Sequence, residues 1–148
     1  MTDVKFSIVL PYNSDESIRL TKLAIRGSLL PDPQEFSINF VNSLNCTDNL
    51  TYHLKVKVPT QTIVENYKLN GEWSNSHREK YLNIFDEFSF SLEFQFDYDN
   101  STINVYQVWG QGHNFVTKFE TLFALSEIQS TQVWGDVRKI EAFELSYD

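Results

Sequence analysis

The chain has 148 residues, of which 41% are hydrophobic, 15% aromatic and 22% charged, and its net charge is −8. This length is typical of one domain, residues 1–148, with enough buried surface for a full core. The acidic balance argues against a nucleic-acid partner, which requires a basic footprint. No stretch approaches the roughly 20 apolar residues of a membrane span, so we expect no membrane insertion.

Cysteine usage and the first residues bear on the compartment. Cys46 is the only cysteine, so no internal disulfide can form and a reducing compartment is favoured. The opening segment MTDVKFSIVLPYNSDES has early acidic residues and lacks the pattern of a signal peptide. We expect a cytoplasmic protein, or one exported to the extracellular space without a signal peptide. The acceptor patterns at Asn45, Asn49 and Asn100 are interpreted as chance matches in polar loops.

Alternation of apolar and polar residues is the dominant pattern and predicts strands. In chain order the predicted strands are KLAIRGSLL at 22–30, FSINF at 36–40, LTYHLKVKV at 50–58, TIVEN at 62–66, FSFSLEFQF at 88–96, INVYQVW at 103–109 and KIEAFEL at 139–145. In the fifth, Phe88, Phe90, Leu92, Phe94 and Phe96 are expected to share the core face.

The segments between these strands carry turn chemistry. They are Pro31–Pro33, Asn42–Asn49, Asn70-Gly71, Asp97–Ser101 and Gly110–Gly112. Weak helical candidates lie at 17–25 and 119–128, and either could equally be strand. Many short strands at intervals near ten residues predict a single all-β domain, an antiparallel β-sandwich or barrel.

The strand at 50–58 places Thr51, His53, Lys55 and Lys57 on the face away from the core. If the next strand pairs with it as a hairpin, Asn66 can lie beside His53. Trp73 comes soon after Asn-Gly, a sequence that strongly favours a turn, and the polar stretch that follows Trp73 ends in Arg78. An indole can cover the C–H face of a sugar, while imidazole, amide and guanidinium groups read its hydroxyls. This constellation predicts a saccharide site.

The same residues resemble the galectin family. Its sugar site carries H-x-N-x-R on one strand, V-x-N on the next and W-G-x-E-x-R after a turn. The chain offers His53 to Lys57, Val64-Glu65-Asn66 and Trp73 to Arg78, with the family's spacing from Asn66 to Trp73. FSINF, FSFSLEF and WGDV extend the resemblance over roughly 27–144. It implies a galectin- or concanavalin-like jelly-roll sandwich that binds galactose-containing glycans without catalysis or cofactor, and often as a homodimer.

The motif also departs from the family. Lys55 and Lys57 replace an asparagine and an arginine, and Ser76 replaces a glutamate. Arg78 then lacks its expected carboxylate partner unless Glu65, Glu72 or Glu79 substitutes. The predicted carbohydrate-binding residues are His53, Lys55, Lys57, Asn66, Trp73, Ser76 and Arg78. The two lysines are most simply a charged outer face, although they could attract an anionic glycan.

Each prediction has an alternative. Trp109 and Trp134 are interpreted as packing residues, and His53 alone could be an ordinary strand residue. His77 and His113 show no metal-ligand spacing, so no metal is expected.

A galectin-fold module that has lost its sugar site and binds a protein is the competing hypothesis for the function. A glycosidase would need two carboxyl groups flanking the scissile bond, and Glu65, Glu72 and Glu79 form no recognisable motif.

Overall fold

The computed structural model describes residues 4–11 and 19–148. Twelve strands and one short 3-10 helix are described: β1 Val4–Val9, β2 Leu20–Leu29, β3 Glu35–Val41, β4 Leu50–Lys57, β5 Thr62–Leu69, β6 Glu72–Trp73, β7 Arg78–Tyr81, β8 Ser89–Asp97, β9 Thr102–Trp109, β10 Gly112–Glu120, η1 Leu125–Glu127, β11 Ser130–Gly135 and β12 Val137–Tyr147. Within these residues no helix is long and apolar enough to cross a membrane.

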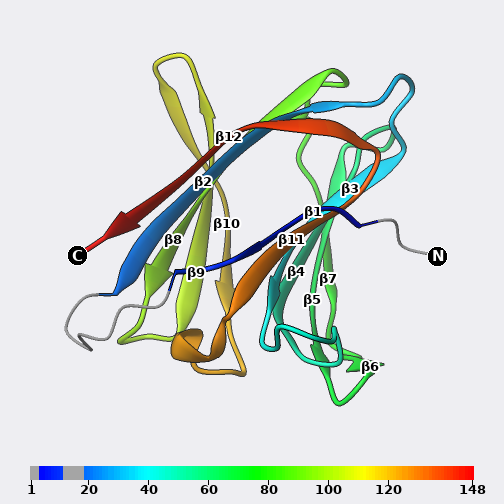
Figure 1. Ribbon diagram of the computed structural model, residues 1–148. Coiled ribbons are helices and arrows are strands. Elements are labelled where there is room, and N and C mark those ends of the chain that lie inside the picture. Colours follow the sequence, from blue (N-terminus) through cyan, green and yellow to red (C-terminus); the bar gives the residue numbers. More distant parts are fainter. Residues whose placement is uncertain (1–3, 12–18) are drawn as a thin grey trace.

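The strands form two antiparallel sheets that pack face to face (Figure 1). The first sheet has the order β1-β11-β3-β4-β5-β6. β7 pairs with the same edge of β5 as β6 does, at the other end of that strand. The second has the order β10-β9-β8-β2-β12. The all-β antiparallel sandwich predicted from the alternation is therefore confirmed. We refer to the side of the first sheet that faces away from the second sheet as its outer face.

The core lies between the sheets and follows the period of two. Phe36, Phe40 and Tyr52 from the first sheet meet Phe90 and Phe94 from the second, and all five are buried. Phe40 contacts Phe94 edge to face with ring centroids 5.0 Å apart, a favourable aromatic geometry. Burial of this apolar surface is the main stabilising contribution to the sandwich.

Two sequence expectations need correction. Phe88 is 71% exposed, because β8 begins only at Ser89 and the preceding segment has not yet entered the sheet. The helical candidates are not α-helices: the described part of the first lies largely in β2, and the second contains the end of β10 and the single turn η1. Pairing of β2 with both β8 and β12 outweighs its weak helical pattern. Residues 17 and 18 of the first candidate lie outside the described residues.

The WGDV segment holds the end of β11 against β3. Gly135 has φ +100°, and a Cβ there would lie 2.5 Å from the Glu35 carbonyl oxygen, so a side chain would clash. Asp136 then accepts hydrogen bonds from the backbone N–H groups of Gln34 and Glu35, at 2.8 and 3.2 Å. These contacts fix where β3 begins, and β3 in turn supports the predicted site.

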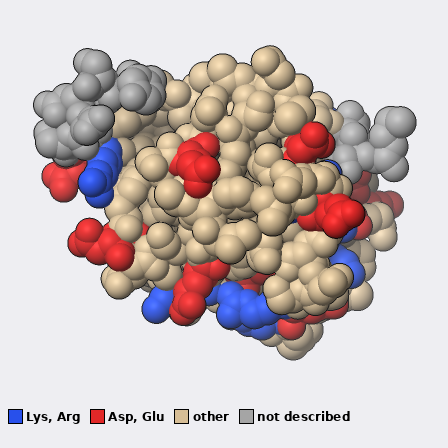
Figure 2. All heavy atoms as spheres, turned by 90° about the horizontal axis from the view of Figure 1, so that it is seen from below, with Lys and Arg blue, Asp and Glu red and all other residues tan. Residues whose placement is uncertain are grey.

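Charges are distributed without a large basic patch on the face drawn in Figure 2. Carboxylates are dispersed across this face, and the Lys and Arg side chains lie toward its periphery. This arrangement agrees with the net charge of −8.

Candidate carbohydrate site

Strand register brings the predicted polar residues into line on the outer face. His53 of β4 is directly opposite Asn66 of β5 and, on its other side, Asn39 of β3. Asn39 in turn is opposite Gln132 of β11. Residues opposite each other in adjacent antiparallel strands project to the same side of the sheet. The predicted hairpin and the approach of Asn66 to His53 are therefore observed.

Trp73 lies beside His53, at the end of the sheet. A two-residue Asn70-Gly71 turn, with both φ values positive, connects β5 to β6 and is typical of a tight hairpin. It sets Trp73 opposite Lys68. The indole and imidazole ring centroids are 4.6 Å apart with a 52° angle between the planes. The Trp73 side chain is 43% exposed, so an apolar surface remains open to a ligand.

Two further residues enclose these rings. The Lys68 ammonium lies 5.1 Å from the Trp73 ring centroid, a cation–π contact. Trp134 of β11 is buried, and its ring centroid is 5.7 Å from that of His53. The sequence analysis interpreted Trp134 as a packing residue, and its burial agrees with this. It packs on the outer face rather than between the sheets.

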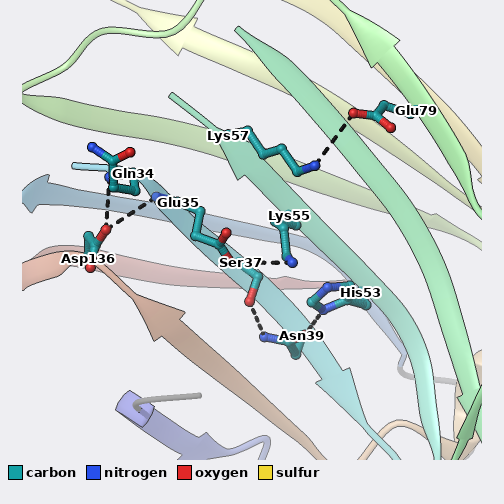
Figure 3. A network of polar contacts seen from close by, with 9 residues as sticks. All are labelled: Gln34, Glu35, Ser37, Asn39, His53, Lys55, Lys57, Glu79 and Asp136. Carbon is teal, nitrogen blue, oxygen red and sulfur yellow. Dashed lines mark hydrogen bonds and ion pairs between the residues drawn. The ribbon is translucent and has the colours of Figure 1, made fainter. Parts of the chain in front are cut away.

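His53 is buried and electrically neutral near pH 7. Burial is the largest cause that lowers the pKa of His53, to about 3, and the nearby charges of Lys55 and Lys68 lower it further. Nδ1 faces the Asn39 side-chain oxygen, while the Asn39 amide nitrogen donates to Ser37 Oγ at 3.0 Å (Figure 3). This orientation makes Nδ1 the donor and leaves Nε2 as an acceptor. An acceptor on a fixed ring suits a sugar hydroxyl.

Lys55 and Lys57 lie on the outer face as predicted, and each has a carboxylate partner. The Lys55 ammonium is 3.2 Å from the Glu35 carboxylate, and that of Lys57 is 3.6 Å from the Glu79 carboxylate (Figure 3). These pairs are partly exposed and contribute little to stability. An anionic ligand on this face would have to compete with Glu35 and Glu79.

Asn66 and Ser76 lie where the sheet edge is interrupted. β5 pairs with β6 through Lys68 and Leu69 and with β7 through 62–65, so Asn66 lies opposite neither strand. Its amide nitrogen donates to the Ser74 carbonyl at 3.3 Å, and its oxygen accepts from the Tyr67 N–H at 2.8 Å. Ser76 is exposed, and its hydroxyl and its backbone N–H both form hydrogen bonds with the Ser74 hydroxyl. The side chain of Asn66 thus shapes the loop that follows Trp73.

Arg78 does not join the other predicted residues on the outer face. It is opposite Glu65, whose side chain is buried between the sheets. The Arg78 Nη2 group donates to Glu65 Oε1 at 3.0 Å and to the Lys118 carbonyl of β10 at 2.7 Å. Arg78 therefore bridges the two sheets at their open edge. Of the three carboxylates considered as its partner, Glu65 is the one that the structure pairs with it.

Glu65 is the centre of a buried polar network that the sequence analysis did not identify. Besides Arg78, it accepts hydrogen bonds from the Tyr52 hydroxyl at 2.5 Å and from Thr117 Oγ1 at 2.9 Å. Burial and then the Glu65 charge raise the pKa of Tyr52 well above its usual value, so Tyr52 remains a donor. The three donors compensate for burial of the carboxylate.

Other site residues were also missed. Asn39 lies within FSINF, where the alternation was used only to place the core side chains. Lys68 lies in a segment that matches no motif, so the sequence did not indicate its position next to Trp73. Their positions follow from strand pairing, which a single sequence does not show. Among the described residues, no group of three or more His, Cys, Asp or Glu side chains could hold a metal ion.

Comparison with known proteins gives one family and a consistent set of structures. The family model described as galactoside-binding lectin matches residues 8–145. Chicken galectin 2 is similar with a TM-score of 0.76 and 16% identity, over 97% of this chain and 99% of that one. Sheep galectin-11, solved in complex with glycerol, has a TM-score of 0.74 and 13% identity, over 95% and 96%. CG-16, a homodimeric agglutinin from chicken liver, has a TM-score of 0.67 and 18% identity, over 99% and 98%.

Proposed function

The chain belongs to the galactoside-binding lectin family, and we propose that its sugar site is the outer face of the first sheet around Trp73 and His53. It is a galectin-like lectin domain that recognises glycans. The proposal is supported above all by one observation: the 43% exposed indole of Trp73 lies 4.6 Å from a neutral, oriented imidazole. An apolar surface next to a directional acceptor is what a galactose-containing glycan requires.

The residues have different roles in this proposal. Trp73 covers the C–H face of the sugar, and His53 Nε2 accepts a hydrogen bond from a hydroxyl. Asn66, which is largely engaged with the Ser74 and Tyr67 backbone, positions the loop after Trp73. Lys55 and Lys57 border the site, and their carboxylate partners restrict their contact with ligand. The site acts by binding and has no catalytic step.

Substitution of Trp73 tests this proposal. Losing roughly 60–80 Å² of apolar contact at ~25 cal/mol/Å² costs about 1.5–2 kcal/mol, so Trp73→Ala should weaken galactoside binding tenfold or more. Isothermal titration calorimetry with a β-galactoside measures this loss. Phe88→Ala is the matched control, because Phe88 is an exposed aromatic residue outside the site, and it should leave affinity unchanged. Equal affinities for wild type and Trp73→Ala would refute the site.

A protein-binding module without sugar affinity is the competing function. Specific observations favour it. The Arg78 guanidinium, whose side chain is 52% exposed, is turned from the outer face toward Glu65 and the Lys118 carbonyl. The Asn66 side chain is satisfied by backbone groups. Two of the predicted hydroxyl readers are therefore committed elsewhere. A glycan array that shows no binding to neutral or acidic galactosides would favour this function over the lectin.

We also propose that the chain forms a homodimer. The structurally similar agglutinin CG-16 is homodimeric, and two sites on one particle would raise the avidity of a shallow, weak site.

A further inference from the structure

A cavity of about 520 Å³ lies at the open edge of the sandwich, between β7 and β10. Both are edge strands among the described residues, where β7 pairs only with β5 and β10 only with β9. We call this cavity the edge cavity. Its lining includes Asn66 and Ser76 from the break between β6 and β7, Arg78 and Lys80 from β7, and Phe115 from β10. It therefore begins next to the Trp73 site and continues between the sheets.

The edge cavity offers hydrogen-bond donors. Arg78 and Lys80 project to the same side of β7, since they are two residues apart. Within the described residues, the hydrogen bonds of Arg78 use only Nη2, so Nε and Nη1 retain their hydrogens for a ligand. The Lys80 ammonium donates to Thr117 Oγ1 at 3.2 Å and keeps two further hydrogens.

The acceptors nearby do not neutralise both cations. Glu65 already accepts from Tyr52, Thr117 and Arg78. In the part of the chain that the structure describes, no carboxylate forms an ion pair with Lys80. Glu120 also lines the edge cavity, with an exposed side chain. The Arg78 guanidinium thus has one buried carboxylate partner, and the Lys80 ammonium is bonded to a hydroxyl and to no carboxylate. This arrangement favours an anionic ligand.

We propose that the edge cavity binds the oxyanion of an acidic saccharide, a sulfate or carboxylate, while the neighbouring sugar ring lies at Trp73. This inference rests on the proposed function. Asn66 lies opposite His53 and also lines the edge cavity, so one ligand can extend from one region to the other. Phe115, which is 58% exposed, supplies an apolar wall for the C–H groups of the acidic sugar.

Other features of the structure favour this location and ligand. On the outer face, Lys55 and Lys57 are already paired with Glu35 and Glu79, so they do not offer free cations. An extended peptide inserted between β7 and β10 would have to break the bond from Arg78 to the Lys118 carbonyl. A small oxyanion can instead bind the unused Arg78 hydrogens and leave this link intact.

The first test uses inorganic sulfate as the probe. Sulfate is titrated into the labelled protein at constant ionic strength, with chloride as the reference, and NMR follows the Arg78 Nε–H and the backbone amides of β10. We expect saturable shifts at these groups. Lys80→Met should weaken sulfate binding about fivefold to tenfold, and Glu120→Gln should strengthen it by removing a like charge. The matched control Lys139→Met, at an exposed lysine of β12 outside both regions, should leave it unchanged. Shifts centred on Lys55 and Lys57, or no saturable shift, would overturn the proposal.

The second test compares a β-galactoside with its sulfated form. The sulfated sugar should bind more tightly to the wild type, and Lys80→Met should remove this advantage without weakening the neutral sugar. If the advantage survives in Lys80→Met, the edge cavity is not the acid subsite although the lectin assignment stands. If sulfate occupies the cavity but neither sugar binds, it is an anion site without a saccharide, which overturns the saccharide part of the inference and the proposed function.

Discussion

The buried imidazole of His53 makes the stability of the fold depend on pH. The pKa of His53 is about 3 in the folded chain, against an ordinary value of 6.5. Well above pH 6.5 the imidazole is neutral in both states and has no effect on the pH dependence. Between pH 6.5 and 3, the unfolded chain binds a proton that the folded chain does not. The free energy of unfolding therefore falls as the pH is lowered through this range.

The magnitude follows from the same two values. Well below pH 6.5 each pH unit costs about 1.4 kcal/mol, and lowering the pH from 7.5 to 5 removes about 2 kcal/mol in all. Urea unfolding monitored by tryptophan fluorescence at pH 7.5, 6 and 5 measures the change. His53→Gln is the comparison, because it keeps a polar side chain without a titrating group. Since His77 and His113 remain in both proteins, the difference between the two pH profiles isolates His53.

We expect the wild type to lose about 2 kcal/mol more than His53→Gln between pH 7.5 and 5. The charges of Lys55 and Lys68 act in the same direction as burial, since both lower the pKa of His53. Parallel pH profiles for the two proteins would refute the reasoning. An imidazole resonance of His53 that titrates near pH 6.5 would also refute it, because the ring would then be accessible to solvent protons in the folded chain.

Two further predictions concern the buried network and the assembly. Glu65→Ala should lower the free energy of unfolding by roughly 2–4 kcal/mol in urea titrations, because the hydroxyls of Tyr52 and Thr117 lose their acceptor. Glu65→Gln keeps an acceptor and should lose less stability, so equal losses in the two variants would contradict this explanation. Sedimentation equilibrium at micromolar concentration should give twice the mass of the 17.3 kDa chain, and a single-chain mass at all concentrations would contradict the homodimer.

The arrangement of His53, Asn66 and Trp73 could be predicted from the sequence because alternation and a tight turn are local properties. LTYHLKVKV fixes which side chains share the face of His53, and the Asn-Gly turn places Trp73 at the start of the next strand. A short turn between β4 and β5 made their pairing the simplest arrangement, and the structure shows His53 opposite Asn66. Phe88 was assigned wrongly because alternation alone does not show where a strand begins.

Arg78 was predicted on the outer face from its spacing in the motif, and the spacing does not take the pairing of β7 with β5 into account. From Trp73 to Arg78 the chain advances five residues, while their partners on β5 go back three, from Lys68 to Glu65. The chain therefore has two more residues here than β5 needs, and this excess lies within residues 74–77, which connect β6 to β7. Lys68 and Glu65 are an odd number of residues apart on one strand, so they project to opposite faces. Arg78, opposite Glu65, must then face away from Trp73.

This reversal changes how the chain can recognise a glycan. Because the Arg78 guanidinium is turned toward Glu65 and β10, the outer face keeps Trp73, the neutral imidazole of His53 and the Lys68 ammonium over the indole. The cations of the edge cavity, Arg78 and Lys80, lie beyond the edge of the sheet. The two groups are separated by the edge of one sheet and joined by Asn66. Contacts to the sugar ring and to an acidic substituent therefore come from different strands. Because Lys80 does not contact Trp73 or His53 in the described structure, the two contributions to affinity should be nearly additive.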